Sequence, residues 1–400
     1  MVSRNSTFEK VVIVGGGGHV GLPLGLCLAE VGHEVIAFDT SEKTVDTINS
    51  GVMPFIEEGA NELLKLHLNS GKFKASCNPI SVSQAEIVII VIGTPIEDHL
   101  SPNPNSVVRA VEQLMPYFKN EQLLVLRSTV FPGVSKRVEN LISKHIPSMD
   151  VAYCPERIAE GQAIKELKSL PQIVGARSDR AFLRASNLFN SLSGKTLRST
   201  PEEAELAKLF TNAWRYLKFA AANQFFMMAN DFNVDYEKVR QVISTDYPRA
   251  YDLPSAGLAA GPCLFKDTMQ LSALVQQNFP LGHAAMMVNE GTPGYIVSRL
   301  ERRFDLSKMT VGILGMAFKA NIDDTRSSLA YKLRKLLMFK CADVLISDPY
   351  VRDYRLVSQS EVLKSADVII IGAPHAVYSE LDSEKEIIDI WGIRNTSTLI

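Results

Sequence analysis

Lys10-Val-Val-Ile-Val-Gly-Gly-Gly-Gly-His-Val-Gly21 is the most informative segment of this 400-residue chain. A β-branched run leads into glycines spaced Gly16-x-Gly18-x-x-Gly21, and a helical pattern follows over residues 20–31. A second apolar run, residues 34–38, ends at Asp39. A strand, a glycine turn, a helix, a strand and an acid in this order are typical of a βαβ unit that binds a dinucleotide.

The glycine turn and Asp39 together predict an NAD site. The first glycine permits the tight turn, the second lets the backbone approach a pyrophosphate, and the third allows close packing of helix and strand. The helix N-terminus adds amide donors and partial positive charge. Asp39 can accept hydrogen bonds from the adenosine ribose and repel a 2′-phosphate, which favours NAD over NADP. The alternative is a structural glycine turn; the predicted cofactor contacts are Gly16, Gly18, His19, Val20, Gly21 and Asp39.

Composition and charge limit the class of protein. The chain is 46% hydrophobic and 22% charged, with a formal net charge of -2, so it lacks a general attraction for nucleic acid or anionic membranes. Five cysteines without CxxC spacing predict reduced thiols and no metal site. A polar N-terminus and apolar runs of only strand length predict a cytoplasmic protein with a small-molecule substrate.

The arrangement of predicted elements indicates three domains, because this length exceeds what one hydrophobic core organises. Further strands at residues 86–92 and 123–126 alternate with helices, as in a parallel sheet covered on both faces. Thr200-Pro-Glu-Glu203 is a capping box that starts a long helix, which runs to about residue 244 with a break near Asn233. Strands at 309–314, 343–347 and 366–372 then repeat the opening pattern.

We therefore expect an α/β fold with two Rossmann-like parallel-sheet domains joined by a long-helix central domain. The expected boundaries are 1–199 for the NAD-binding domain, 200–304 for the helical domain and 305–400 for the C-terminal domain. The turn at Gly315 lacks the triple-glycine pattern, so a second dinucleotide site is not expected there.

Two pairs of residues could carry chemistry. Cys263 lies where a loop feeds a helix, a position that lowers a thiol pKa and exposes the sulfur, and Asp267 falls on the same helical face. Lys208 and Asn212 are also four residues apart, and a lysine with an amide can stabilise an alkoxide. The alternatives are a buried apolar cysteine, which we assign to Cys27 and Cys341, and a solvated surface pair.

Seven segments in order resemble the UDP-glucose/GDP-mannose dehydrogenase family along nearly the whole chain. They are the glycine loop with Asp39, Gly93-Thr-Pro95, Arg127-Ser-Thr-Val-Phe-Pro-Gly133, Cys154-Pro-Glu-Arg-Ile-Ala-Glu-Gly161, Glu205-Leu-Ala-Lys-Leu-Phe-Thr-Asn212, Cys263-x-x-Lys-Asp267, and Gly315-Met-Ala-Phe-Lys319 with Asp324-Thr-Arg326. The resemblance implies a four-electron oxidation with two NAD, in which the C6 alcohol of a nucleotide sugar becomes a carboxylate through a thiohemiacetal and a thioester on Cys263.

The resemblance also implies roles for individual residues, and a homodimer. Lys208 and Asn212 correspond to the oxyanion-stabilising pair, Asp267 and Thr129 to a pair that positions water, and Glu160 to the acid/base of hydrolysis. Arg249 corresponds to an arginine that reaches the neighbouring subunit's substrate phosphates. The expected substrate contacts are Glu156, Arg249, Lys266 and Lys319, and the further expected cofactor contacts are Lys43, Thr94, Thr129 and Arg326.

The loop before Cys263 departs from the family's GFGGSC pattern. It reads Leu258-Ala-Ala-Gly-Pro-Cys263, and Pro262 removes an amide donor, so recognition of the sugar by backbone amides is expected to differ. The Pro-Glu-Arg-Ile-Ala-Glu-Gly segment resembles the branch of the family that acts on UDP-N-acetylhexosamines, which implies a substrate such as UDP-N-acetylmannosamine or UDP-N-acetylglucosamine. The alternatives are a UDP-glucose 6-dehydrogenase, a two-electron β-hydroxyacid dehydrogenase, and a non-catalytic module that binds NAD or a nucleotide sugar.

Overall fold

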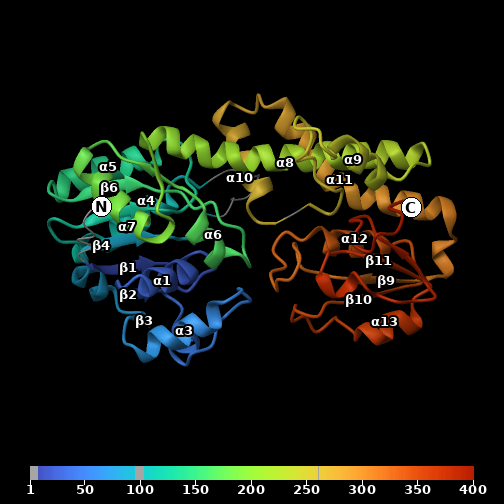
Figure 1. The fold of residues 1–400 in the computed structure, drawn as a ribbon, viewed down its shortest axis with the longest axis horizontal. Helices are drawn as coiled ribbons and strands as arrows, with labels where there is room; N and C mark the ends of the chain where they lie inside the picture. Colours follow the sequence, from blue (N-terminus) through green and yellow to red (C-terminus); the bar gives the residue numbers. More distant parts are fainter. Residues whose placement is uncertain (1–7, 95–102, 260) are drawn as a thin grey trace. The chain divides into compact units, whose positions relative to one another are not determined.

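The computed structural model describes residues 8–94, 103–259 and 261–400 (Figure 1). Pro95 of the Gly93-Thr-Pro95 segment and Ala260 of the loop before Cys263 therefore lie outside the described residues. The chain divides into two compact units, Met1–Phe210 and Thr211–Ile400. In the described residues no helix combines the length and the hydrophobicity that crossing a membrane requires.

An 8-stranded sheet forms the centre of the first unit, in the order β3-β2-β1-β4-β5-β6-β7-β8. Neighbouring strands run parallel except β6 and β7, which are antiparallel, so the prediction of a parallel sheet is confirmed apart from this one pair. The strands are β1 (Lys10–Val14), β2 (Glu34–Phe38), β3 (Phe73–Ser76), β4 (Ile87–Ile90), β5 (Leu123–Leu126), β6 (Asp150–Tyr153), β7 (Gln172–Gly175) and β8 (Thr196–Ser199).

Helices cover both faces of this sheet, because successive strand residues point to opposite sides. Val11 and Ile13 join one core with α1 (Gly21–Glu30), α3 (Ala60–Asn69), α6 (Ala163–Ser169) and α7 (Asp179–Ser193). Val12 and Val14 join a second core with α4 (Ser106–Leu114) and α5 (Val134–His145). The remaining helical segments of this unit are α2 (Glu42–Asn49), η1 (Pro79–Gln84) and η3 (Met115–Tyr117).

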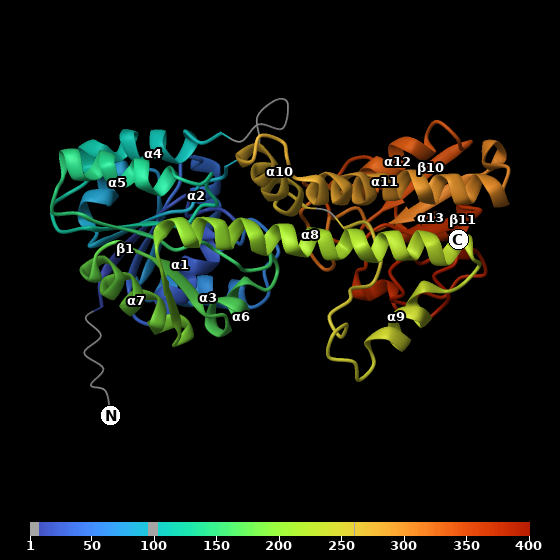
Figure 2. The same cartoon turned by 90° about the horizontal axis from the view of Figure 1, so that it is seen from above.

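The long helix predicted from Thr200 is α8 (Pro201–Asp231), which stands out in Figure 2. The capping box is present: the Thr200 hydroxyl accepts from the Glu203 N–H at 3.2 Å, and the Glu203 carboxylate accepts from the Thr200 N–H at 2.8 Å. The helix ends before Asn233, which has φ +56°, and α9 (Tyr236–Ser244) follows. The predicted break near Asn233 is therefore confirmed.

The second unit combines a helical part with a second parallel sheet. Its 4-stranded sheet has the order β10-β9-β11-β12. The strands are β9 (Thr310–Leu314), β10 (Asp343–Ser347), β11 (Val368–Ile371) and β12 (Glu386–Ile388), and the helical segments are α10 (Leu264–Leu274), α11 (Pro280–Arg303), η4 (Leu306–Lys308), α12 (Leu329–Leu337), α13 (Gln359–Ser365) and η5 (Ala376–Tyr378). Two Rossmann-like sheets, with a helical segment between them in the sequence, confirm the predicted fold class, whereas the three-domain boundaries stay a prediction.

Candidate active site

The carboxyl ends of four neighbouring strands form the predicted cofactor site in the first unit. The glycine turn follows β1, Asp39 follows β2, and Thr94 and Thr129 lie beyond β4 and β5. The chain leaves β1 toward β2 on one side, while β4 adds on the other side, so the strand order reverses between β1 and β4. Open parallel sheets bind ligands in the crevice at such a switch point.

The glycine turn has the shape that a bound diphosphate needs. A Cβ on Gly16 would lie 2.6 Å from the Cα of Ala37, and one on Gly21 would lie 2.4 Å from the Gly15 oxygen. A Cβ on Gly18 would meet only the Gly15 oxygen, at 3.6 Å, so the space above the second glycine is open. The tight turn itself falls on Gly15, with φ +81°, rather than on Gly16 as predicted. The turn therefore fits a dinucleotide.

Asp39 is held against this turn. Its Oδ2 accepts a hydrogen bond from the Gly17 N–H at 3.0 Å, and its Oδ1 accepts one from the Ser41 N–H at 3.1 Å. The residue is half-buried, so lone pairs remain accessible to a ribose. Lys43 is exposed in the first turn of α2, and the His19 ring stacks on Phe55 with centroids 4.0 Å apart.

The loops after β4 and β5 are joined through two hydroxyl groups. The Thr94 hydroxyl donates to the Thr129 carbonyl oxygen at 2.8 Å. The Ser128 hydroxyl accepts from the Ile92 N–H at 2.8 Å and donates to the Ile92 oxygen at 2.9 Å. Thr94 and Thr129 are therefore neighbours beyond β4 and β5, and their contact with the cofactor stays a prediction.

Glu156 forms a buried ion pair that the sequence did not reveal. Its Oε2 accepts from Arg127 Nε at 2.8 Å and from the terminal nitrogen of the same guanidinium, and its Oε1 accepts from the Arg157 and Ile158 N–H groups. Arg127 also donates to the Cys154 oxygen at 3.1 Å. These contacts favour a structural role for Glu156 over the predicted substrate contact, because its carboxylate holds the loop that carries Glu160.

Glu205 is a second buried acid with a structural task. It is fully buried, and its carboxylate accepts from the Gly133 N–H at 2.7 Å and from the Ser135 N–H at 2.8 Å. It thereby caps the N-terminus of α5 with charge of the favourable sign. Lys208 lies one turn later on α8 and is 8% exposed, which argues against the alternative of a solvated surface lysine.

Cys263 differs from the other four cysteines in its exposure. It is exposed at the N-cap of α10, whereas Cys27 and Cys154 are buried and Cys77 and Cys341 are half-buried; no disulfide joins any of the five. Burial raises the pKa of Cys27 and of Cys154 to about 12 and that of Cys341 to about 11. A helix N-terminus favours a thiolate. Position and exposure therefore single out Cys263 as the nucleophile candidate.

Asp267 lies one helical turn after Cys263 and is fully buried. Its Oδ2 accepts from Asn212 Nδ2 at 2.5 Å, and Lys266 Nζ lies 3.5 Å from its Oδ1. Asn212 is 4% exposed, so the pair is shielded from solvent. The second unit therefore places the buried Asn212–Asp267 pair, with the half-buried Lys266 beside it, next to the Cys263 turn.

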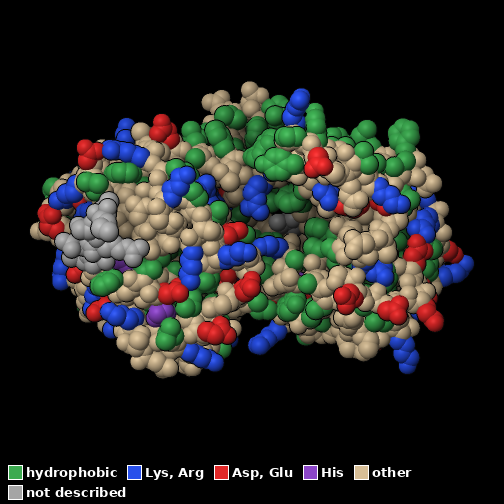
Figure 3. Space-filling view, in the orientation of Figure 1, with side chains coloured by type: hydrophobic (Ala, Val, Ile, Leu, Met, Phe, Trp, Pro, Cys, Tyr) green, Lys and Arg blue, Asp and Glu red, His purple; other side chains and the backbone are tan. Residues whose placement is uncertain are grey.

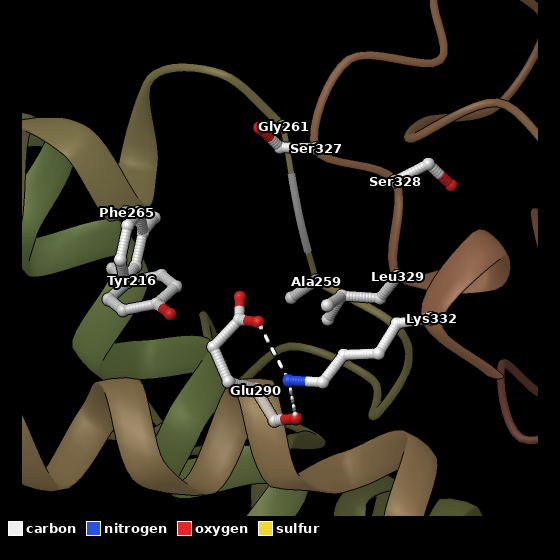
Figure 4. Close-up of a pocket in the computed structure, with 9 residues that line it drawn as sticks. All are labelled: Tyr216, Ala259, Gly261, Phe265, Glu290, Ser327, Ser328, Leu329 and Lys332. Atoms are coloured by element: carbon white, nitrogen blue, oxygen red, sulfur yellow. Dashed lines mark hydrogen bonds and ion pairs between the residues drawn. The ribbon is translucent and has the colours of Figure 1, made fainter. Parts of the chain in front are cut away.

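A pocket of about 280 Å³ adjoins the loop before Cys263 (Figure 4). The Tyr216 and Phe265 rings form one wall, and Lys332 Nζ lies 3.1 Å from Glu290 Oε2 at another. Ser327, with φ +56°, and Ser328 bring the start of α12 to the same space. The other lining residues are Ala259, Gly261 and Leu329.

The remaining predicted residues lie on loops of the second unit. Lys319 is half-buried in the loop that follows β9. Arg326 pairs with Asp324, its Nε donating to Oδ2 at 2.8 Å. Arg249 is exposed and stacks on Tyr247 at 5.3 Å.

Four other predicted site residues belong to the first unit: Thr129, Glu156, Glu160 and Lys208. Their approach to Cys263 therefore stays a prediction.

Three domain profiles match the chain in order. Residues 9–193 match the NAD binding domain of the UDP-glucose/GDP-mannose dehydrogenase family, residues 202–291 match its central domain, and residues 312–395 match its UDP binding domain. The matched segments follow the same succession as the first sheet, the long helix and the second sheet.

Archaeal proteins are similar over nearly the whole chain. A UDP-N-acetyl-D-mannosamine dehydrogenase of Methanocaldococcus jannaschii is 28% identical over 96% of this chain and 90% of its own length. The structure of a UDP-D-ManNAc dehydrogenase from Pyrococcus horikoshii is 27% identical, with a TM-score of 0.88 over 96% of both chains. The structure of a UDP-glucose dehydrogenase from Pyrobaculum islandicum is 26% identical, with a TM-score of 0.90 over 98% of this chain and 96% of that one.

Replacing Asp39 tests the cofactor site. We expect Asp39→Asn to weaken NAD binding roughly tenfold and to narrow the preference over NADP, because a hydrogen bond to a charged group contributes about 1.5–3 kcal/mol. Calorimetric titration with both cofactors measures the change. Asp46→Asn removes the same charge from an exposed site on α2 and is the matched control. Unchanged NAD affinity in Asp39→Asn would show that Asp39 only supports the glycine turn.

Proposed function

The chain belongs to the UDP-glucose/GDP-mannose dehydrogenase family, and on that premise we propose that it oxidises the C6 primary alcohol of a nucleotide sugar to a carboxylate. The observation that carries the proposal is Cys263, an exposed thiol at a helix N-terminus, one turn before the buried Asp267–Asn212 pair. When NAD is bound at the carboxyl ends of β1 and β4 in the first sheet, it supplies a hydride acceptor for each of two oxidations.

The proposed reaction has two oxidations separated by a covalent step. Loss of a hydride and a proton from the C6 alcohol gives an aldehyde. The Cys263 thiolate then adds to the aldehyde carbon, and the new C–S bond makes a thiohemiacetal that retains the substrate. Loss of a second hydride and proton gives a thioester. Water breaks the C–S bond, which releases the carboxylate and restores the thiol.

Buried polar groups support the charge that this sequence develops. We assign Lys208 and Asn212 to the oxyanion of the alkoxide and of the tetrahedral intermediate, since an ammonium and an amide donate hydrogen bonds well in a shielded site. Asp267 and Thr129 would position the water, and Glu160 would take its proton during hydrolysis. Burial of Lys208, Asn212 and Asp267 supports these roles, because each group costs free energy unless it has partners.

Basic side chains are suited to the diphosphate of the substrate. Lys266 and Lys319 offer point charges, and Arg249 offers a planar fork that can bind a phosphate with two hydrogen bonds. Arg249 is exposed, as a residue that serves a neighbouring subunit would be. Its proposed role therefore requires a homodimer.

An apolar face on the helical part of the second unit supports the proposed homodimer. Figure 3 shows hydrophobic side chains gathered on this part of the surface. The exposed residues recur on one side of α8 and continue past its end: Trp214, Phe225, Met228 and Phe232 are 59%, 47%, 51% and 80% exposed. Large exposed apolar faces usually mark protein contacts. We also propose a cytoplasmic location, since all five cysteines are without disulfides.

The substrate we favour is a UDP-N-acetylhexosamine, in particular UDP-N-acetylmannosamine. The similarity to two UDP-N-acetylmannosamine dehydrogenases supports it, together with the Pro155–Gly161 segment. UDP-glucose is the alternative, because the Pyrobaculum structure is equally similar.

Two other functions explain less of the chain. A two-electron β-hydroxyacid dehydrogenase needs no nucleophilic cysteine, and that function does not explain the presence of the second sheet. A non-catalytic module has no need for a buried Asp267–Asn212 pair behind an exposed thiol.

Removing the sulfur tests the proposed mechanism. We expect Cys263→Ala to reduce carboxylate formation by at least about a thousandfold, because the covalent intermediate cannot form, while NAD affinity is unchanged. Product analysis by mass spectrometry measures the acid, and calorimetry measures NAD binding. Cys77→Ala, a half-buried thiol of the first unit, is the control and should keep full activity. Acid formation that survives in Cys263→Ala would eliminate the covalent route.

A panel of nucleotide sugars tests the proposed substrate. UDP-N-acetylmannosamine, UDP-N-acetylglucosamine, UDP-glucose and GDP-mannose are compared by their rates of NADH release. We expect the highest kcat/KM with a UDP-N-acetylhexosamine, by about tenfold or more over UDP-glucose, since an acetamido group fills space and pairs with polar groups that a hydroxyl leaves unpaired. A preference for UDP-glucose or GDP-mannose would contradict the assignment and leave the oxidation chemistry intact.

A further inference from the structure

Each of the two sheets has an aspartate at the same topological position. Asp39 follows β2, the neighbour of β1, and Asp348 follows β10, the neighbour of β9. Both accept hydrogen bonds from the loop that leaves the adjacent strand: Asp39 from the Gly17 N–H, and Asp348 Oδ2 from the Met316 and Ala317 N–H groups at 2.6 and 3.1 Å. The second sheet therefore repeats the local geometry of the cofactor site.

The two aspartates differ in what remains free for a ligand. The Asp348 side chain is fully buried. Its Oδ1 accepts from the Tyr350 and Val351 N–H groups, and its Oδ2 also accepts from His375 Nε2 at 3.0 Å. Burial by itself would raise the pKa of Asp348, but the hydrogen bonds from His375 and the backbone outweigh it and lower the pKa. Five protein donors surround the carboxylate, so it serves the protein rather than a ribose.

His375 extends this contact to the far end of the same loop. The ring is fully buried, and its Nδ1 accepts from the Asn321 N–H at 2.8 Å, which places the ring proton on Nε2 toward Asp348. Asn321 has φ +58°, and its side-chain Oδ1 accepts a hydrogen bond from the Ala376 N–H at 2.9 Å. The rings of Tyr350 and Tyr378 pack edge-on against the imidazole.

Lys319 lies between these two attachment points. Asp348 holds residues 316 and 317, and His375 holds residue 321, so the connected pair constrains the backbone on both sides of the lysine. We propose that Asp348 and His375 are positioning residues that fix the 315–321 loop and so set the place at which Lys319 meets the substrate diphosphate. This inference rests on the substrate role proposed above for Lys319.

A misplaced lysine weakens binding of the nucleotide sugar more than it slows the chemistry at Cys263. We expect His375→Ala to raise KM for the nucleotide sugar about tenfold, with kcat changed less than about threefold and KM for NAD unchanged. His375→Gln should recover part of the loss, because its carboxamide offers one acceptor and one donor. Tyr378→Phe is the control, because Tyr378 is as buried as His375 and its ring packs against the imidazole. The Tyr378 hydroxyl has no hydrogen-bond partner in the described residues, so its removal breaks no hydrogen bond there.

A double-mutant cycle with Lys319→Ala separates positioning from a general structural role. If His375 acts through Lys319, adding His375→Ala to Lys319→Ala raises KM no further. Additive effects would overturn the proposal, as would equal losses in kcat and in kcat/KM for His375→Ala. If Lys319→Ala alone leaves KM unchanged, the substrate role of Lys319 is wrong, and the positioning role falls with it.

A milder variant covers the case in which His375→Ala does not fold. Asn321→Gly keeps the positive φ accessible and removes only the side-chain contact with Ala376. We expect a rise in KM for the nucleotide sugar of about threefold, which is absent when Lys319 is already alanine. Two results together would contradict the proposal. One is an unchanged KM for the nucleotide sugar in folded Asn321→Gly, and the other is a fall of kcat in His375→Gln that is as large as the fall in His375→Ala.

Discussion

The hydrogen bond between Asn212 and Asp267 is the contact on which the proposed site depends. A fully buried carboxylate is costly unless donors surround it, and here the amide of α8 and the ammonium of Lys266 lie beside it. The bond joins α8 to α10 and so fixes the first turn of α10. Cys263 is the N-cap residue of that turn. The nucleophile candidate is therefore held by a buried polar pair although its sulfur is exposed.

The two sheets use one local geometry for two purposes. In the first sheet the acid after the second strand stays half-buried and supports an open glycine turn. In the second sheet the corresponding acid is enclosed, and the loop beside it carries a lysine in place of the glycines. The half-buried acid of the first sheet is predicted to bind a ribose. The enclosed acid of the second sheet has no room for one and instead holds the loop that positions the lysine.

Local signals in the sequence predicted most of the fold. The β-branched runs, the capping box at Thr200 and the break at Asn233 are each encoded within a few residues, and the structure confirms them. Cys263 was identifiable because a glycine-proline loop before an apolar helical pattern places it at a helix start. The parallel pairing of the strands followed from the alternation of strands and helices, apart from the antiparallel pair of β6 and β7.

Contacts between distant residues could not be predicted. Arg127 and Glu156 are 29 residues apart, Glu205 lies 72 residues from Gly133, and Asp348 lies 27 residues from His375. From the sequence alone, each of these charged side chains would be assigned to the surface, because the partner that it contacts lies far away along the chain. The positive φ at Gly15 escaped prediction for another reason, since four adjacent glycines leave the position of the turn undetermined.

The stoichiometry of the complete reaction tests the central claim most directly. A limiting amount of nucleotide sugar is converted to completion with excess NAD, and NADH, aldehyde and carboxylate are quantified together. A thiol that retains the aldehyde between two oxidations predicts two NADH for each carboxylate and no released aldehyde. One NADH for each sugar, with an aldehyde or a ketone as the product, would contradict the account.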